Sequence, residues 1–270
     1  MTMVTSDDVR NAYDGAEGRV YELMMGELLH VGGLKSSLEL ADLAGIAEGS
    51  RGVDLCCGNG ASMRMLIQLK NVASMIGVDL SEKQVERTAI RTEQAGLGDR
   101  IRVVCGDACE TGLPDGEADF VWSEDAWCYV PDKTKLVAEA VRITRPGGTI
   151  AFTDWTLGDR PLADAERESL FAMLKFPGLW SGDEYRKALL DDGCEIVEIN
   201  DVGRFARSFE LYHDMFDLQF GWDVLQIFPG DPALLEMLTG QLAFVRDLGR
   251  AGKVGQTRVI ARRPVVGHTP

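Results

Sequence analysis

The chain has 270 residues, of which 45% are hydrophobic and 26% are charged, as expected for a globular protein with one large domain or one domain and a small cap. Its 43 acidic residues outnumber the 28 lysines and arginines, and the net charge of −15 disfavours nucleic acid and anionic membrane partners and leaves a small-molecule substrate as the expectation. The sequence has no segment apolar and long enough to span a membrane and no secretory signal, so we expect a cytoplasmic protein.

The N-terminal region has a helical pattern. Apolar residues recur at helical spacing from Ser6 to His30, and Gly32 and Gly33 end the pattern. A second helix is predicted over residues 35–46.

Residues 49–156 alternate between short apolar strands and helical stretches. In chain order they are RGVDLCC, Ala61–Lys70, ASMIGVD, Glu82–Ala95, RIRVVCGD, ADFVWSE, Lys133–Thr144 and GTIAFTDW. The helix over Lys133–Thr144 is expected to end at the RPGG sequence. This alternation predicts βαβ units and a mostly parallel sheet with helices on both faces.

The pattern after Trp155 is looser. Helices are predicted over Ala163–Leu174, Asp183–Asp191, Arg207–Leu225 and Pro232–Arg250, and strands at CEIVEIND and QTRVIARRP. The expected fold is therefore a Rossmann-like α/β fold with seven strands.

The cysteines argue against a metal site. Six cysteines occur, no pair has C-x-x-C spacing, and none of the three histidines lies near a cysteine pair. Cys56, Cys105 and Cys128 lie in apolar runs, where a free cysteine behaves as a small hydrophobic residue. We therefore expect reduced thiols and no bound metal.

The ends of the predicted strands carry the functional pattern, because ligands of an open parallel sheet bind there. The first strand leads into CCGNG, where Gly58 and Gly60 supply two glycines of a dinucleotide fingerprint and Met63 replaces the third. A pyrophosphate fits badly without that third glycine. Asp79 can still bind a ribose diol, and Asp107 can lie beside an adenine. This combination describes S-adenosylmethionine (SAM).

The segments VDLCCGNG, GVDLS, VVCGDA, DFVWSEDAW and RPGGTIAFTDW together resemble class I SAM-dependent methyltransferases. Their order and spacing match over roughly residues 50–155. The resemblance implies SAM as cofactor, S-adenosylhomocysteine as product, and cofactor-binding roles for Tyr21, Asp54, Gly58, Gly60, Asp79, Leu80, Asp107, Ala108, Ser123 and Glu124. Among these, Asp79 would hold the ribose hydroxyls and Asp107 the adenine amine.

Cys56 occupies the first glycine position of the D-x-G-x-G-x-G pattern of this family. We expect it to stay in the β region of backbone conformation, where a Cβ is tolerated. The alternative, that Cys56 and Cys57 are reactive thiols, is disfavoured because no basic residue is adjacent in the sequence.

The flanking segments narrow the resemblance. YELMMGELLHVGG resembles the N-terminal lid of small-molecule N-methyltransferases, including sarcosine/dimethylglycine and glycine/sarcosine methyltransferases, although Met25 stands where these often have tryptophan. WSEDAWCYVPDK and RAGKVGQTRVIARR also fit that group. The resemblance implies a lid over residues 1–48, a SAM-binding core over 49–156, and cap insertions with the final strands over 157–270.

The sequence leaves three classes of function open. The first expectation is an amine such as an N-methylated glycine. The second is C- or O-methylation of a secondary metabolite, for example a prenyl diphosphate or a phenol. The third is a non-enzymatic protein that binds SAM or NAD. The oligomeric state is also open, a homodimer included.

Candidate catalytic residues are Asp125 and Tyr129, which share one face of a helical turn, and His213 in the predicted roof. His30, which closes the lid segment, is interpreted as structural. Aromatic rings in a cleft attract ammonium groups, although the same rings can simply pack the sheet against the cap. The candidate substrate-binding residues are Trp127, Trp155, Trp180, Tyr212, Phe216 and Trp222.

Overall fold

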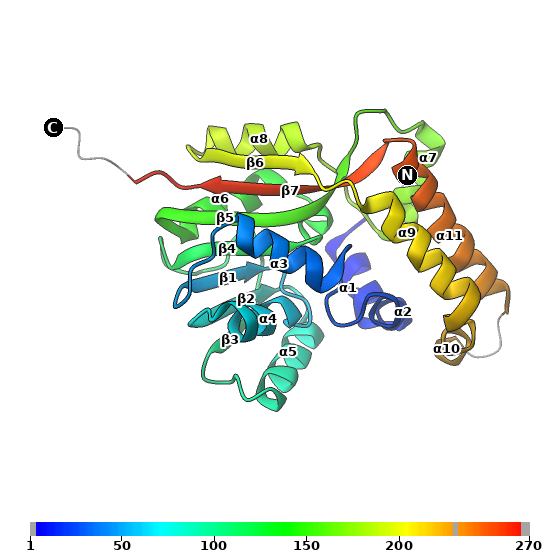
Figure 1. The fold of residues 1–270 in the computed structure, drawn as a ribbon, viewed down its shortest axis with the longest axis horizontal. Coiled ribbons are helices and arrows are strands. Elements are labelled where there is room, and N and C mark those ends of the chain that lie inside the picture. Colours follow the sequence, from blue (N-terminus) through cyan, green and yellow to red (C-terminus); the bar gives the residue numbers. More distant parts are fainter. Residues whose placement is uncertain (1–3, 229–231, 266–270) are drawn as a thin grey trace.

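A seven-stranded sheet forms the centre of the computed structural model, which describes residues 4–228 and 232–265 (Figure 1). The strands lie in the order β3-β2-β1-β4-β5-β7-β6. Only β7 runs antiparallel to its neighbours, β5 and β6. The strands are β1 (Arg51–Leu55), β2 (Ser74–Asp79), β3 (Ile101–Cys105), β4 (Ala118–Glu124), β5 (Thr144–Leu157), β6 (Glu195–Asp201) and β7 (Val254–Arg262). The predicted Rossmann-like sheet is confirmed.

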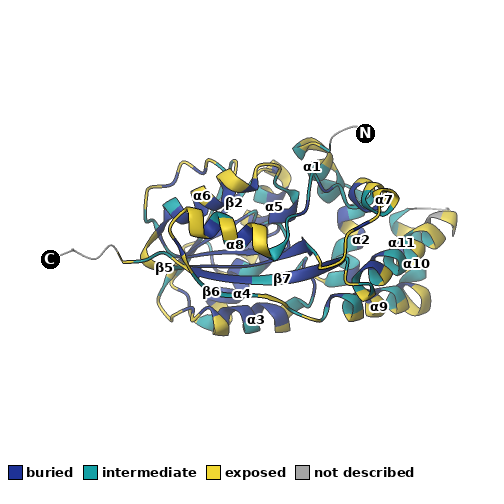
Figure 2. Cartoon of the chain, turned by 90° about the horizontal axis from the view of Figure 1, so that it is seen from above, coloured by how far each residue is buried: buried dark blue, intermediate teal, exposed yellow. Residues whose placement is uncertain are grey.

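Helices cover both faces of this sheet. On one face, α3 (Gly33–Leu43) and α4 (Ala61–Lys70) pack their apolar residues against Trp122 of β4. On the other face, α6 (Lys133–Ile143) and α8 (Gly182–Asp191) pack against Phe152 of β5. The helix α5 (Glu82–Gln94) contacts β2 and β3. Figure 2 shows β7 buried beneath α8, whose outer surface is exposed. Buried apolar surface on both faces thus fixes the sheet.

The remaining helices gather beyond the carboxyl ends of the parallel strands (Figure 1). They enclose a separate apolar core, in which Val20, Trp155 and Phe209 are buried. None of the helices in the described part of the chain is both long and apolar enough to cross a membrane. These cap helices are α1 (Ser6–Asp14), α2 (Ala16–Met25), α7 (Asp164–Leu174), α9 (Phe205–Met215), α10 (Gly221–Ile227) and α11 (Pro232–Arg250).

The cap therefore roofs the edge of the sheet at which ligands bind. We keep the boundaries 1–48, 49–156 and 157–270 as a proposal. Within the first segment, α1 and α2 belong to the cap, whereas α3 belongs by its packing to the sheet.

The predicted N-terminal helix is two helices. Thr5 caps α1 through a reciprocal pair of hydrogen bonds with Asp8. Gly15 has an extended backbone and separates α1 from α2. The second helix ends at Met25, because Gly26 has a φ of 74°, a conformation that glycine adopts at little cost.

One further prediction on an element end is confirmed, and one was wrong. The helix α6 ends at Ile143, just before the RPGG segment, as expected, and Thr144 already pairs with Ala118 in the sheet. The residue before a proline favours an extended backbone, and a register shift between Ala118 and Phe120 accommodates the glycines. The predicted helix over 207–225 is divided into α9 and α10 by a π-helical turn over Phe216–Phe220.

Candidate active site

A cavity of about 410 Å³ lies at the carboxyl ends of the first four strands, and we call it the first cavity. Asp54, Asp79, Asp107 and Glu124 line it, each at or just after the end of a different strand. The cap supplies the other wall through α1 and residues 27–30. A cavity of this volume fits a nucleoside-sized ligand.

Polar contacts hold the cap over this cavity. Ser81 Oγ donates to Asp14 Oδ1 at 2.9 Å, and Asn59 Nδ2 donates to the carbonyl of Glu27 at 2.8 Å. Arg64 forms a salt bridge to the Glu27 carboxylate at 2.6 Å. Each contact joins a cap residue to a residue just after a strand or in α4, so the cap is attached at the edge of the cavity.

The loop after β1 is tighter than the sequence suggested. Cys56 has a φ of 65°, so the expectation that it remains in the β region was wrong. Its N–H donates to the carbonyl of Val78 at 2.8 Å, which fixes this left-handed turn. Gly60 has a φ of 74°, and a Cβ there would lie 2.3 Å from Thr88 Cγ2. Position 60 therefore requires glycine for both a conformational and a steric reason, whereas the positive φ of Cys56 strains its backbone.

Replacing Cys56 tests that strain. We expect Cys56→Val to lower the free energy of unfolding by about 1–3 kcal/mol, because a β-branched residue is strongly disfavoured at positive φ. Cys56→Gly is expected to be tolerated. Urea denaturation of both variants measures the difference. A Cys56→Val protein as stable as Cys56→Gly would show that residue 56 is extended in solution.

The thiols of the loop are unsuited to nucleophilic chemistry. Burial raises the pKa of Cys56 and of Cys57 well above the ordinary value, so neither is a thiolate at neutral pH. All six cysteines are free. Cys105 is exposed, contrary to the expectation that it packs as a small hydrophobic residue.

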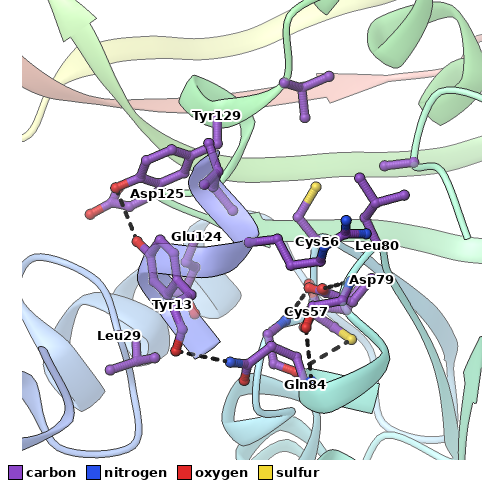
Figure 3. A pocket seen from close by; sticks show the side chains of 18 of the residues that line it. Tyr13, Leu29, Cys56, Cys57, Asp79, Leu80, Gln84, Glu124, Asp125 and Tyr129 are labelled. Carbon is purple, nitrogen blue, oxygen red and sulfur yellow. Dashed lines mark hydrogen bonds between the residues drawn. The ribbon is translucent and has the colours of Figure 1, made fainter. Parts of the chain in front are cut away.

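Asp79 is a carboxylate of the first cavity that backbone N–H groups hold in place. It accepts from the N–H of Gly58 at 2.8 Å and from the N–H of Ser81 at 2.9 Å, and burial raises its pKa. Figure 3 shows Asp79 beside Cys57, with Gln84 on the same side of the cavity. Gln84 is 4% exposed, and its Oε1 has no hydrogen-bond partner. An unsatisfied buried acceptor on a cavity wall favours a ligand with hydroxyl or amine donors.

Most of the predicted cofactor residues meet at this cavity. It is lined by Asp54, Gly58, Asp79, Leu80, Asp107, Ala108 and Glu124. Three others lie elsewhere. Ser123 is fully buried and donates to the carbonyl of Leu55 at 2.8 Å. Gly60 directly precedes α4, and its left-handed backbone shapes the loop after β1 without lining the cavity. Tyr21 lines a different cavity.

That second cavity, of about 260 Å³, lies between the sheet and the cap. Its wall is mainly aliphatic and aromatic, with Val20, Met24, Phe209 and Leu242 among the contributors. Predicted residues Tyr21, Trp155 and Phe216 also line it. The two cavities meet at a shared wall made of Tyr13, Leu29, His30, Asp125 and Tyr129.

Other residues predicted to bind substrate or catalyse lie outside both cavities. Trp127 is buried against Phe152, with ring centroids 4.0 Å apart, and Trp180 packs on Tyr185. Tyr212 packs on Phe209, and Trp222 is 70% exposed. His213, on α9, is half-buried, and its Nδ1 lies 3.3 Å from Asp214 Oδ1. Helical spacing could not distinguish these packed or outward-facing rings from cavity-lining ones.

Asp125 is a fixed part of the shared wall. It has a φ of 51°, accepts from the N–H of Val31 at 2.8 Å, and accepts from Gln256 Nε2 at 2.8 Å. Burial raises its pKa. Because both carboxylate oxygens already accept hydrogen bonds within the protein, Asp125 is better suited to holding residues 30 and 31 in place than to taking a proton.

Tyr129 is paired with a residue that the sequence analysis missed. The Tyr13 hydroxyl lies 3.0 Å from the Tyr129 hydroxyl, and their rings meet edge to face (Figure 3). Burial raises the pKa of both phenols well above the ordinary value. Both are therefore neutral hydrogen-bonding groups at the junction of the two cavities.

His30 is another residue of the shared wall that the sequence analysis did not assign to the site. It is 3% exposed, and its Nε2 lies 3.3 Å from Glu124 Oε1 and 3.0 Å from Ser37 Oγ. Glu124 Oε2 in turn accepts from Ser62 Oγ at 2.7 Å. The sequence did place His30 at the end of the lid segment, but nothing local indicated that a strand-end glutamate would meet it.

Asp154, near the carboxyl end of β5, fixes the backbone of Cys128, the residue before Tyr129 of the shared wall. Its Oδ1 accepts from the N–H of Cys128 at 2.9 Å, and its Oδ2 accepts from the Tyr185 hydroxyl at 2.5 Å. Burial raises its pKa from the ordinary 3.8 to about 7. The folded state therefore keeps a proton that the unfolded state has released.

This carboxyl group predicts a pH dependence of stability. The contribution of Asp154 to the free energy of unfolding is present below pH 3.8 and is lost as the pH rises to about 7, by at most about 1.4 kcal/mol per pH unit. Asp154→Asn mimics the protonated form, so we expect its stability relative to the unmodified protein to increase with pH. Urea denaturation between pH 4.5 and 8 measures the difference, and parallel curves would contradict it.

No group of three or more metal-ligating side chains is present in residues 4–228 and 232–265.

Comparisons with known proteins agree with this geometry. The model of the family described as "Methyltransferase domain" matches residues 53–152. The sequence is 32% identical over 228 residues to the 27-O-demethylrifamycin SV methyltransferase of Amycolatopsis mediterranei (strain S699), and the match covers 77% of this chain and 80% of that protein.

Two solved structures share the fold. A protein of Galdieria sulphuraria assigned as a sarcosine dimethylglycine methyltransferase superposes with a TM-score of 0.75 at 24% identity, covering 86% of each chain. The geranyl diphosphate C-methyltransferase of Streptomyces coelicolor A3(2), in complex with Mg²⁺, geranyl diphosphate and S-adenosyl-L-homocysteine, superposes with a TM-score of 0.69 at 21% identity, covering 85% of this chain and 78% of that chain.

The sequence relative covers most of both chains, and the matched region contains the strand ends that line the first cavity. The enzyme uses SAM as its cofactor and a small molecule as its methyl acceptor. By these findings the chain belongs to the class I SAM-dependent methyltransferases.

Proposed function

We propose that SAM binds in the first cavity, with its ribose hydroxyls on Asp79 and Gln84 and its adenine beside Leu80 and Asp107. Two observations support this placement: Asp79 is held by backbone N–H groups at the end of β2, and the buried Gln84 Oε1 has no partner. The sulfonium of the bound cofactor supplies an electrophilic methyl group. The protein then has to position the acceptor and, for a hydroxyl, remove a proton.

The acceptor in this proposal is an apolar small molecule that is methylated on a hydroxyl group. The observation that carries it is the mainly apolar second cavity, which meets the first cavity at Tyr13, His30, Asp125 and Tyr129. An N-methylated glycine fits this lining less well, because a small zwitterion gains little from aliphatic walls. The relative from Amycolatopsis, by its name, methylates 27-O-demethylrifamycin SV, which is consistent with an oxygen acceptor.

His30 is the proposed general base. It lines both cavities, and its Nδ1 lies 3.4 Å from the Val31 carbonyl. Its Nε2 lies 3.0 Å from Ser37 Oγ, whose hydroxyl can instead donate to Glu124 Oε2, so Nε2 can take a proton. Glu124 Oε1, 3.3 Å from Nε2, can then stabilise the protonated ring. Asp125 is occupied by Val31 and Gln256, and the raised pKa of Tyr129 disfavours its phenolate. His30 therefore has the role that we first expected of Asp125, Tyr129 or His213.

An amine acceptor is the second candidate. The rings of Tyr13, Tyr21 and Tyr129 lie together at the second cavity, and aromatic faces attract ammonium groups. A neutral amine needs no base, so turnover of an amine would survive replacement of His30.

Methyl transfer from labelled SAM to a panel of acceptors tests the proposal. The panel contains hydrophobic alcohols and phenols, lipophilic amines, sarcosine, dimethylglycine and a prenyl diphosphate. We expect label in the O-methyl product of an apolar alcohol or phenol. Turnover of sarcosine or dimethylglycine alone would contradict the proposal. A cytoplasmic location, a lack of nucleic acid partners and a homodimer remain predictions.

A further inference from the structure

Glu17 of α2 is the one acidic side chain that lines the second cavity away from the wall shared with the first, within the described residues. Its Oε2 atom is buried and has no hydrogen-bond partner. A buried polar atom without a partner costs free energy, and native proteins rarely leave one unused. The carboxylate is thus an open acceptor on an otherwise mainly apolar wall.

The surroundings of Glu17 do not supply a partner for its Oε2 atom. Tyr21 lies one helical turn further along α2, and burial, with the nearby Glu17 charge, raises its pKa. Lys175 also lines the cavity, but its Nζ donates to the carbonyl of Ala172 at 3.1 Å. The Tyr13 and Tyr21 rings are 5.5 Å apart on the same side of the cap. A ligand group is therefore the partner that the site lacks.

We infer that Glu17 is a specificity-determining residue, and that the acceptor carries an N–H or O–H donor that binds its carboxylate. This inference rests on the proposed function, because it places the acceptor in the second cavity. An ammonium group gains most, since it adds charge pairing and contact with the tyrosine rings to the hydrogen bond. A hydroxyl gains the hydrogen bond alone, and an ether gains neither.

Three probes with the same ring separate these cases: 2-naphthylmethylamine, 2-naphthylmethanol and 2-(methoxymethyl)naphthalene. Their dissociation constants are measured by calorimetry on protein saturated with S-adenosylhomocysteine. We expect the amine and the alcohol to bind about tenfold more tightly than the ether, as one buried hydrogen bond to a charged group predicts.

Two variants assign the preference to Glu17. Glu17→Leu keeps the size of the side chain and is expected to give one dissociation constant for all three probes. Glu17→Gln keeps an acceptor oxygen without the charge. If Glu17→Gln weakens the binding of the amine probe alone, the site prefers a cationic group on the acceptor. If Glu17→Gln binds the amine and the alcohol as tightly as the unmodified protein does, the site prefers a hydroxyl. The matched control is Glu86→Leu, because Glu86 is exposed on α5 and lines neither cavity.

The outcomes separate this inference from the proposed function. If the ether binds as tightly as the alcohol and the amine, the inference fails while the apolar cavity stands. The same holds if Glu17→Leu, with an unchanged melting temperature, keeps the preference for donors. If none of the probes binds, both the inference and the proposed acceptor class fail.

Discussion

Asp79→Ala is expected to weaken the binding of S-adenosylhomocysteine by about tenfold to a hundredfold. The carboxylate would accept a hydrogen bond from one ribose hydroxyl, with Gln84 accepting from the other, and one hydrogen bond to a charged group contributes about 1.5–3 kcal/mol. The variant also removes the acceptor for the N–H groups of Gly58 and Ser81. The loop after β1 therefore loses part of its support at the same time. Calorimetric titration of the purified variant measures the change.

Two further proteins make this result interpretable. Asp79→Asn retains one acceptor oxygen and is expected to bind with intermediate affinity. Asp99→Ala removes an exposed carboxylate that does not line the first cavity and should bind normally. Unchanged affinity in Asp79→Ala, with a normal melting temperature, would remove Asp79 from the ribose site.

The second large effect is expected at His30. With an apolar alcohol as acceptor, His30→Ala should lower kcat by about a hundredfold to ten-thousandfold, the range for loss of a general base. Binding of S-adenosylhomocysteine should change much less, because Glu124 keeps its hydrogen bonds from Ser37, Ser62 and Trp122. Initial rates at saturating SAM and a parallel calorimetric titration measure the two effects.

His213→Ala is the matched control for His30, since His213 is half-buried beside Asp214 and lines neither cavity. We expect its kcat to be unchanged. A role limited to packing would lower stability without altering the pH profile of kcat, so the profile of His30→Gln is also recorded. Equal losses in His30→Ala and His213→Ala would contradict the proposed base.

The sequence was sufficient for the sheet and for the edge of the sheet at which the first cavity lies. Period and composition predicted α4 and β4 with the bounds that the structure has, because a short buried strand and an amphipathic helix are local patterns. The strand-end residues Asp79 and Asp107 follow from the same reasoning, since the carboxyl ends of parallel strands meet at one edge. Local patterns therefore predict which strand-end residues meet at one edge, although the complete sheet is needed to bring them together.

The cap could not be predicted to the same depth. Whether the Trp155 ring reaches the cavity depends on how α7, α9 and α11 pack against each other, and the position of Trp127 depends on Phe152 of β5 and Tyr185 of α8. These contacts are distant in sequence. The meeting of His30 with Glu124 has the same origin. Cys56 shows another limit of prediction from the sequence. The hydrogen bond to the carbonyl of Val78 imposes a left-handed backbone on it, although the cysteine side chain disfavours that conformation.

The shared wall has a practical consequence for redesign. Met24, Phe209, Phe228 and Leu242 line the second cavity and not the first. With the ligands placed as proposed, a mutant library confined to these positions would change the volume offered to the acceptor and leave the nucleoside contacts intact. We then expect substrate scope and coenzyme affinity to be separately adjustable in this scaffold.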